Sequence, residues 1–317
     1  MNNLLSIVVP HYNTPDSLLR LLHSIPMRED IEIIVVDDNS DIPFEKLRQR
    51  IEIFPQVHLF QNDSGVKGAG ASRNIALREA EGKWVLFADA DDYFVEGFYE
   101  KISPYLESDY DIVYFSPISI DEETGEKSAR HVAYKEYVNR YYHKPSLKNM
   151  TALKYGFCTP WSKLIRLNLL REHDIVFDEI RVANDIMCMT KCAYYSRKIT
   201  ATNATIYCVT RSAGTLTSKM SEQNFDTRIE VLVQRYSFLR EHLSKREFRY
   251  TNVSRFALSK LARVIFEHRG IKKLFSVLDL YRKHKVRILD IGLLNPLTLF
   301  NEVKMKLSQF WDIKKHQ

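Results

Sequence analysis

The chain has 317 residues, of which 45% are hydrophobic and 27% are charged. It is long enough to bury a substantial core without disulfide staples, as one large α/β domain with an appendage or as two modest domains. No run of about 18 apolar residues occurs, and the chain enters a strand without a basic leader and cleavage site, so we expect a protein that is neither membrane-spanning nor secreted. Its four cysteines lack the spacing of a zinc site, which predicts reduced thiols in the cytoplasm: Cys158, Cys188, Cys192 and Cys208.

The formal net charge of +6 is unevenly spread along the chain. Residues 240–317 hold 18 Lys and Arg against 7 Asp and Glu, which leaves residues 1–239 with a net charge of −5. A basic C-terminal region suits either an anionic lipid surface or a nucleic acid. Composition alone leaves both kinds of partner open.

Strands and helices alternate through the first part of the chain. The apolar run at 4–9 predicts a strand. A helix is expected next, with Thr14 as its cap, Pro15 in its first position and its end at residue 25. The further expected elements are strands at 31–36, 57–60 and 83–88 and helices at 43–54 and 69–80. This alternation predicts a parallel sheet with right-handed crossovers.

The pattern after residue 90 is more mixed. The expected elements are a helix at 95–106, a strand at 111–116, a loop or hairpin at 118–132 with a turn at 121–125, helices at 162–171 and 185–195, and a strand at 205–209. From residue 221 the chain is almost wholly helical by pattern, with breaks at 269–270 and 295–296. It contains no internal repeat or low-complexity linker, so we expect the helical region to pack on the main domain.

Three carboxylates follow the fourth expected strand, where an apolar run at 84–88 ends in Asp89, Asp91 and Asp92. Ligands in open α/β sheets bind beyond the carboxyl ends of the strands, and carboxylates there can hold a hard divalent cation against a diphosphate. The alternative for any one of the three is a cap for the following helix. A cap needs only one carboxylate, so three indicate a metal site.

Three other segments carry groups suited to a nucleotide at the same sheet edge. After the first strand, Tyr12 offers a ring for base stacking and Asn13 an amide, although a tyrosine there can also be rim packing. After the second, Asp38 can accept a hydrogen bond from a uracil imide or a ribose hydroxyl, or it can cap a turn. The glycine-rich segment 65–74 opens a helix with Arg73 and can face a phosphate, or it can be a flexible loop that lets helices pack closely.

These segments together resemble the donor half of the family 2 glycosyltransferases. The order and spacing of residues 6–13, 33–40, 70–74 and 87–92 match that family. The resemblance implies the GT-A fold, a nucleotide-diphosphate sugar donor with UDP as the favoured nucleotide, and inversion at the anomeric carbon. It also implies a Mn²⁺ or Mg²⁺ ion held by Asp91, with Asp89 near the ribose or in the outer sphere of the metal. The implied donor-binding residues are Pro10, Tyr12, Asn13, Asp38, Gly70, Arg73, Asp89 and Arg211.

The resemblance extends more loosely to residue 220. Segments 160–164 and 176–179 are similar to the acceptor half of the family, in which a Glu-Asp pair usually opens a helix. Here the pair is Asn184-Asp185, so the first carboxylate is missing while the second, the implied catalytic base, remains. The other reading of this pair is a helix cap. The implied acceptor residues are Trp161, Lys163 and Asn184, and Tyr207, Arg211, Gly214 and Thr215 resemble a segment that closes near the donor diphosphate.

The resemblance gives a domain plan and an expected activity. We expect a GT-A catalytic domain at 1–220, with a donor half at 1–110 and an acceptor half at 111–220, followed by a helical, basic C-terminal region at 221–317. The expected acceptor is a glycan or a lipid-diphosphate-linked glycan in capsule or lipopolysaccharide synthesis. One sugar is expected to be added per encounter, because the Gln-x-x-Arg-Trp motif of processive members is absent. Specificity is expected in loops, chiefly at 118–155.

The C-terminal tail adds a possible location. Five apolar residues form a stripe with lysines nearby: Phe300, Val303, Leu307, Phe310 and Trp311. The stripe fits a helix that lies on the anionic inner face of the cytoplasmic membrane, or else a helix face that packs in the core. Aromatic and basic residues also interleave at 248–250 and 281–285, but without a nucleic-acid motif, so no nucleic-acid partner is expected. Missing first-turn glycines argue against a nicotinamide-dependent oxidoreductase. Asn184 keeps a non-catalytic sugar-nucleotide binder open.

Overall fold

The structure is a computed structural model, and it describes residues 4–211, 221–267 and 269–287. The chain divides into two compact units, Met1–Val231 and Leu232–Gln317. Gly214 and Thr215, and the stripe from Phe300 to Trp311, lie outside the described residues. In the described part, no helix combines the length and apolar character needed to cross a bilayer.

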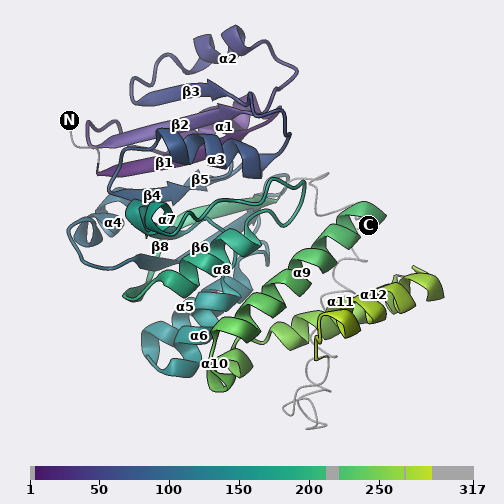
Figure 1. The fold of residues 1–317 in the computed structure, drawn as a ribbon. Coiled ribbons are helices and arrows are strands. Elements are labelled where there is room, and N and C mark those ends of the chain that lie inside the picture. Colours follow the sequence, from purple (N-terminus) through teal and green to yellow (C-terminus); the bar gives the residue numbers. More distant parts are fainter. Residues whose placement is uncertain (1–3, 212–220, 268, 288–317) are drawn as a thin grey trace. The chain divides into compact units, whose positions relative to one another are not determined.

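An eight-stranded, mainly parallel sheet forms the centre of the first unit (Figure 1). Its strands are β1 (Leu5–His11), β2 (Ile31–Asp37), β3 (Val57–Gln61), β4 (Trp84–Phe87), β5 (Tyr93–Phe94), β6 (Ile112–Asp121), β7 (Lys163–Arg166) and β8 (Ile199–Arg211). They are ordered β3-β2-β1-β4-β7-β6-β8-β5. β7 runs antiparallel to β4 and β6, and β5 antiparallel to β8, while the other neighbours are parallel. The expected parallel sheet is therefore confirmed, with an antiparallel strand inserted in it.

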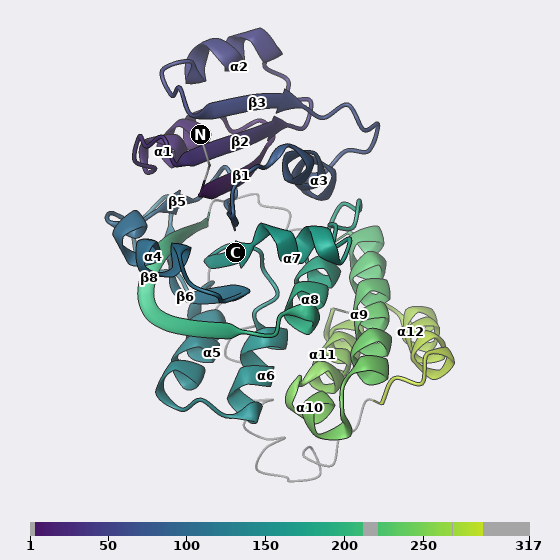
Figure 2. The ribbon, with the colours of Figure 1, turned by 60° about the vertical axis from the view of Figure 1, so that its left-hand side comes forward.

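Helices cover both faces of this sheet. They are α1 (Pro15–His23), α2 (Phe44–Ile51), α3 (Ala69–Glu79), α4 (Phe98–Leu106), α5 (Val132–His143), α6 (Leu147–Gly156), α7 (Leu167–Glu172) and α8 (Ile186–Tyr195). A further helix, α9 (Glu222–His242), begins in this unit and extends past its end. Figure 2 shows α1 and α3 on opposite sides of the β1–β3 layer. Because the crossovers change face between β1 and β4, the carboxyl ends of these two strands form a switch point, where open α/β sheets bind ligands.

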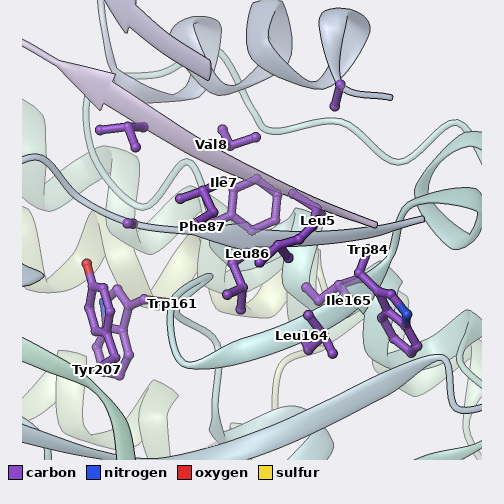
Figure 3. Close-up of a cluster of buried hydrophobic side chains, with 14 of the residues drawn as sticks. Leu5, Ile7, Val8, Trp84, Leu86, Phe87, Trp161, Leu164, Ile165 and Tyr207 are labelled. Carbon is purple, nitrogen blue, oxygen red and sulfur yellow. The ribbon is translucent and has the colours of Figure 1, made fainter. Parts of the chain in front are cut away.

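The core explains why the first strands form. β2 is buried along its whole length, and Leu5, Ile7, Val8 and Val9 of β1 have no exposed surface, as expected for strands covered on both faces. Figure 3 shows Ile7 and Val8 beside Phe87, with Leu164 and Ile165 of β7 in the same cluster. The register pairs His11 with Asp37, so the strand ends bring these two polar residues together.

Two expectations for the middle of the chain are wrong. The helix expected at 162–171 begins only at Leu167, because Lys163–Arg166 pairs as β7 between β4 and β6. The loop expected at 118–155 contains the end of β6 and the helices α5 and α6. These helices form because Val138 and Leu153 reach the core, and because Ser146 caps α6 by accepting a hydrogen bond from the Asn149 N–H.

Smaller differences concern element ends. Thr14 stands at the N-cap of α1 and Pro15 follows it, as expected, but the Thr14 side chain makes no capping bond. The short strand β5 was not expected, and α4 begins at Phe98 rather than at residue 95. The turn at 121–125 is confirmed by the Gly125 N–H, which donates to the Asp121 carbonyl at 2.8 Å.

The second unit contains the short helix α10 (Lys245–Tyr250) and the longer α11 (Val253–Phe266) and α12 (Ile271–Lys283). Ser244 and Glu247 form a capping box at the start of α10. The Tyr281 hydroxyl donates to the Ala257 carbonyl at 3.1 Å, so the end of α12 meets the early part of α11 and the two helices form an antiparallel hairpin. The expected break at 269–270 is confirmed, with Gly270 at a φ of 87°.

Candidate active site

A buried histidine–carboxylate pair joins the ends of β1 and β2. His11 Nδ1 lies 2.8 Å from Asp37 Oδ1, and both side chains are buried. The Thr14 N–H donates to His11 Nε2, so Nδ1 carries the proton that bonds Asp37. Burial acts to raise the pKa of Asp37, but hydrogen bonds from His11 and Ser40 outweigh it and hold that pKa below its usual value. This pair fixes the strand ends.

The next carboxylate, Asp38, is positioned by a residue that the sequence reasoning missed. Asn62 Nδ2 donates to Asp38 Oδ1 at 2.6 Å, and the Asp38 N–H donates to the His11 carbonyl at 2.8 Å. Asn62 also donates to the Val66 carbonyl, which shapes the loop before α3. The available signal was an asparagine at the end of the third expected strand. Asp38 keeps one carboxylate oxygen without a hydrogen bond to any described residue.

The loop after β1 exposes a tyrosine. Tyr12 is 45% exposed, and the Lys67 ammonium lies 4.4 Å from the centre of its ring. Asn13 has a φ of 54°, and its side chain exchanges two hydrogen bonds with Asp41, both of 2.7 Å. Asn13 therefore ties the loop after β1 to the loop after β2. Pro10 pairs with Val36 within the sheet, just before this loop.

Arg73 on α3 connects two parts of the site that are far apart in sequence. Its Nη2 donates to Asp89 Oδ1 at 2.5 Å, and its Nη1 donates to Asn184 Oδ1 at 3.0 Å. The start of α3 can approach this closely because Gly70 has no side chain: a Cβ there would lie 2.2 Å from the Asp178 carbonyl oxygen. The predicted phosphate-facing arginine is thus engaged by side chains of both the donor and the acceptor halves.

The three carboxylates after β4 do not have equal surroundings. Oxygens of Asp89, Asp91 and Asp92 all lie within 4.8 Å of one another. Asp92 is buried, and it accepts hydrogen bonds from the Tyr207 hydroxyl at 2.9 Å and from the Thr210 N–H at 2.7 Å. Tyr207 also accepts a hydrogen bond from the Asp89 N–H. Asp92 therefore anchors residues 89–92, the acidic segment, to β8.

Asp91 is the member of this group whose carboxylate is open, in the sense that no described side chain donates a hydrogen bond to it. Its carbonyl oxygen accepts hydrogen bonds of 2.5 Å from Arg20 and from the Thr210 hydroxyl, which fixes its backbone. Burial, together with the charge of Asp89, raises the pKa of Asp91 to about 6. An oxygen-rich cluster with an unsatisfied carboxylate fits a hard divalent cation, which would supply the missing positive charge.

Asp185 occupies the N-cap of α8, yet its carboxylate makes no capping hydrogen bond, so the reading of this side chain as a cap is wrong. Ala183, two residues earlier, has a φ of 61°, a conformation that side chains with a Cβ disfavour. Burial raises the pKa of Asp185, and the positive charge of Arg73 opposes this rise. Asp185 therefore lies near Arg73, and no described side chain donates a hydrogen bond to its carboxylate.

The predicted acceptor residues Trp161 and Lys163 lie beneath the surface. Trp161 is 6% exposed, and its ring stacks on that of Tyr207 with ring centres 6.0 Å apart. Figure 3 shows the two rings side by side. The Lys163 ammonium donates to the carbonyls of Phe157 and Thr159, both at 2.5 Å, and burial lowers its pKa to about 8. Both residues brace the loop before β7, and their contact with an acceptor stays a prediction.

Two further residues complete the description of this region. Arg211 is exposed at the end of β8, where its carbonyl accepts a hydrogen bond from the Glu122 N–H. Tyr134 of α5 packs edge-on against Trp161 at 5.0 Å between ring centres. Sequence reasoning missed Tyr134 because it assigned this segment to a loop.

Comparison with known proteins identifies the group to which this site belongs. The profile of "Glycosyl transferase family 2" matches residues 6–174, more than half of the chain. The chain belongs to glycosyl transferase family 2. The matched range holds the family 2 motifs from Ser6 to Asp92, and Asp185 follows it.

Curated relatives share this family 2 region. The chain is 26% identical over 211 residues to the poly(ribitol-phosphate) beta-N-acetylglucosaminyltransferase TarS of Staphylococcus aureus strain MW2, a match that covers 64% of this chain and 34% of TarS. It is 23% identical over 258 residues to the putative glycosyltransferase EpsH of Bacillus subtilis, covering 77% and 71%. The chain spans about a third of the length of TarS and of the Streptococcus pneumoniae glycosyltransferase GlyA.

Solved structures confirm the GT-A fold. The crystal structure of S. aureus TarS 1–349 superposes with a TM-score of 0.61 at 23% identity, covering 82% of this chain and 74% of that one. The same TarS fragment in complex with UDP-GlcNAc superposes with a TM-score of 0.58, covering 80% and 75%. At this identity the likeness shows the architecture alone.

Proposed function

We propose that this chain is an inverting glycosyltransferase that moves one sugar from a UDP-sugar to a hydroxyl of a glycan or lipid-diphosphate-linked glycan. The observation that carries the proposal is the double contact of Arg73 with Asp89 and Asn184. One side chain links the acidic segment after β4 to the residue next to Asp185. A single displacement needs this proximity, because the base and the departing diphosphate act on opposite sides of one sugar ring.

In the donor half, Tyr12 stacks on the base, and Asp38 accepts a hydrogen bond from the uracil imide through its open oxygen. The exposure of Tyr12 and the support of Asp38 by Asn62 favour these roles. UDP is favoured because TarS, which shares the fold, has been crystallised with UDP and with UDP-GlcNAc. The other donor-binding residues in this proposal are Pro10, Asn13, Gly70, Arg73, Asp89 and Arg211.

Asp91 holds a Mn²⁺ or Mg²⁺ ion, with Asp89 as its neighbour. When bound, the ion neutralises charge that develops on the departing nucleoside diphosphate. Asp92 is not a ligand in this proposal, because Tyr207 and Thr210 already satisfy its oxygens. The protein contributes a rigid segment, since Arg20 and Thr210 hold the backbone of Asp91.

Asp185 is the general base. Its carboxylate takes the proton from an acceptor hydroxyl while the oxygen of that hydroxyl bonds to the anomeric carbon, and the bond to the diphosphate breaks with its electron pair leaving on UDP. Base assistance of this kind contributes roughly 100-fold to 10,000-fold to the rate. The raised pKa of Asp185 suits a group that must accept a proton near neutral pH.

The acceptor is proposed as part of a cell-surface polysaccharide, at the cytoplasmic face of the membrane. TarS is named for transfer to poly(ribitol-phosphate), a polymer with free hydroxyl groups, and this supports a polymeric acceptor. Trp161, Lys163 and Asn184 act on the acceptor side. The membrane contact of the stripe from Phe300 to Trp311 lies outside the described residues and stays a prediction.

The experiment combines a binding screen with a hydrolysis assay. A thermal-shift panel of nucleotide sugars with Mn²⁺ or Mg²⁺ identifies the donor, and release of UDP to water is then measured with the wild type and with Asp91→Asn. We expect stabilisation by a UDP-sugar only when metal is present, and slow metal-dependent hydrolysis that the variant lacks. Metal-dependent binding without hydrolysis would indicate a sugar-nucleotide binder, and absence of UDP-sugar binding would contradict the proposal.

A further inference from the structure

The α11–α12 hairpin of the second unit displays apolar side chains at its tip. Ile265 and Phe266 end α11 with 56% and 61% of their surfaces exposed, and Ile271 and Phe275 open α12 with 69% and 63% exposed. Twelve large hydrophobic residues are exposed in the described part of the chain, and five of them lie between Phe256 and Phe275. Single exposed apolar residues are ordinary, but such a concentration marks an interaction surface.

The tip has a fixed shape. Glu267 forms ion pairs with Arg263, at 2.5 Å, and with Arg269, at 2.7 Å. The backbone N–H of Arg269 donates to the Val264 carbonyl at 3.1 Å. Val264, Val277 and Tyr281 are buried, so the hairpin has its own apolar contacts. The exposed side chains at the tip are therefore additional to the residues that hold the two helices together.

The sequence around the tip is basic. Residues 263–275, which hold the tip, contain four Lys and Arg and one Glu, a net charge of +3. Lys272 is exposed next to Ile271, and Lys283 and Lys285 are exposed at the other end of α12. Apolar side chains bordered by lysines match an anionic lipid surface, whose headgroups attract the charge and whose acyl boundary accepts the rings.

We propose that the α11–α12 tip, formed by Ile265, Phe266, Ile271 and Phe275, inserts into the surface of an anionic phospholipid bilayer. A nucleic acid would use the charge but would leave the isoleucines exposed to water. The tip belongs to the second unit and shares no residue with the site in the first, so this inference does not depend on the proposed glycosyl transfer. It also does not depend on the stripe from Phe300 to Trp311.

The test measures co-sedimentation of the full chain with vesicles of phosphatidylglycerol and phosphatidylcholine. We expect the wild type to bind these vesicles and to bind pure phosphatidylcholine much more weakly. The double variant Phe266→Ser, Phe275→Ser should lower the vesicle partition coefficient at least about 10-fold. The reason is that the favourable free energy of moving two aromatic rings from water into the bilayer is lost. Lys272→Glu should lower it about fivefold or more, and higher salt should weaken wild-type binding.

Matched controls use exposed residues of the first unit. Ile53→Ser removes an isoleucine that is 61% exposed, and Lys46→Glu reverses an exposed lysine. Both should leave vesicle binding unchanged. All variants should keep the wild-type melting temperature, because the altered side chains lie at the surface.

Three outcomes would overturn the inference. They are wild-type binding that does not distinguish anionic from neutral vesicles, binding that the double phenylalanine variant retains, and absence of vesicle binding. Light scattering of the same proteins then identifies a different occupant: a wild-type dimer that the double variant converts to monomer would assign the tip to self-association.

Discussion

Two groups of carboxylates at one edge of the sheet have opposite surroundings. After β2, Asp37 accepts hydrogen bonds from His11 and Ser40, and its pKa is lowered even though it is buried. After β4 and before α8, Asp91 and Asp185 receive no hydrogen bond from any side chain that the structure describes, and their pKa values are raised. Satisfied carboxylates hold a loop in place. Unsatisfied ones cost stability and are retained where chemistry needs them.

Asp185→Asn gives the largest expected effect. Loss of the base should lower turnover roughly 100-fold to 10,000-fold while the affinity for UDP and Mn²⁺ stays within about twofold. The measurement pairs a UDP-release assay with calorimetric titration of UDP. Asp178→Asn is the matched control, because burial also raises the pKa of Asp178 but no role in proton transfer is assigned to it. Equal losses in the two variants would contradict the assignment of Asp185.

Asp91→Asn should act on donor binding. We expect the metal-dependent gain in UDP affinity to fall roughly 100-fold, because the open carboxylate of the acidic segment is lost. Titration of UDP with and without Mn²⁺ measures this gain directly. The account of Asp91 fails if the variant still binds UDP more tightly with Mn²⁺ than without it, by the wild-type factor.

Tyr207→Phe tests the anchor of the acidic segment. Its hydroxyl joins the Asp89 N–H to the Asp92 carboxylate, so its removal should loosen the segment and weaken Mn²⁺ binding about 10-fold. Tyr105→Phe is the control, since the Tyr105 ring packs edge-on against Phe115 and its hydroxyl makes no hydrogen bond with these carboxylates. Electron paramagnetic resonance of free Mn²⁺ gives the affinity. Unchanged affinity in Tyr207→Phe would mean that β8 does not position the metal site.

The smallest effects concern stability, and they should have opposite signs in the two groups. Asp37→Asn should destabilise the fold by about 1–3 kcal/mol at neutral pH, since a buried hydrogen-bonded network is broken. Because the folded pKa of Asp37 is lowered, its contribution is complete above the unfolded value and is lost as pH falls through the folded pKa. The difference between wild type and variant should therefore shrink in acid.

For Asp185 the folded pKa is raised, so ionisation costs stability as pH rises through the window between the unfolded and folded values. Asp185→Asn should then be more stable than the wild type at neutral pH, by about 0.5–2 kcal/mol. Denaturant titrations at several pH values between roughly 4 and 8, about the range in which proteins are most stable, measure the free energy of unfolding. Comparison with the wild type then gives the stability difference for Asp37→Asn and for Asp185→Asn. Destabilisation by both variants would remove the distinction between the two carboxylate groups.

The sequence predicted the donor half well because its signals are local. Buried strands such as 31–36 are continuous apolar runs, and polar residues at their ends must meet at one sheet edge. The acceptor half was harder. β7 has only four residues, and it is a strand because β4 and β6 flank it, a long-range cause that no local pattern carries.

The site shows the same division. The sequence named Asp91 and Asp185, which the structure leaves open, and it named Arg73, which the structure bonds to Asp89 and Asn184. It did not distinguish Asp92, whose partner Tyr207 lies 115 residues away. Asn62 was missed for the same reason, because its role depends on a contact with Asp38 across two strand ends.

The central claim is that the open carboxylates at 91 and 185 face the two sides of one sugar donor. A crystal structure of Asp185→Asn with the UDP-sugar and Mn²⁺ tests it most directly, since anomalous scattering locates the ion. The account predicts manganese bound by Asp91 and the diphosphate, with the anomeric carbon between the diphosphate and the side chain at 185. Manganese and diphosphate bound away from Asp91, or a sugar turned away from residue 185, would contradict it.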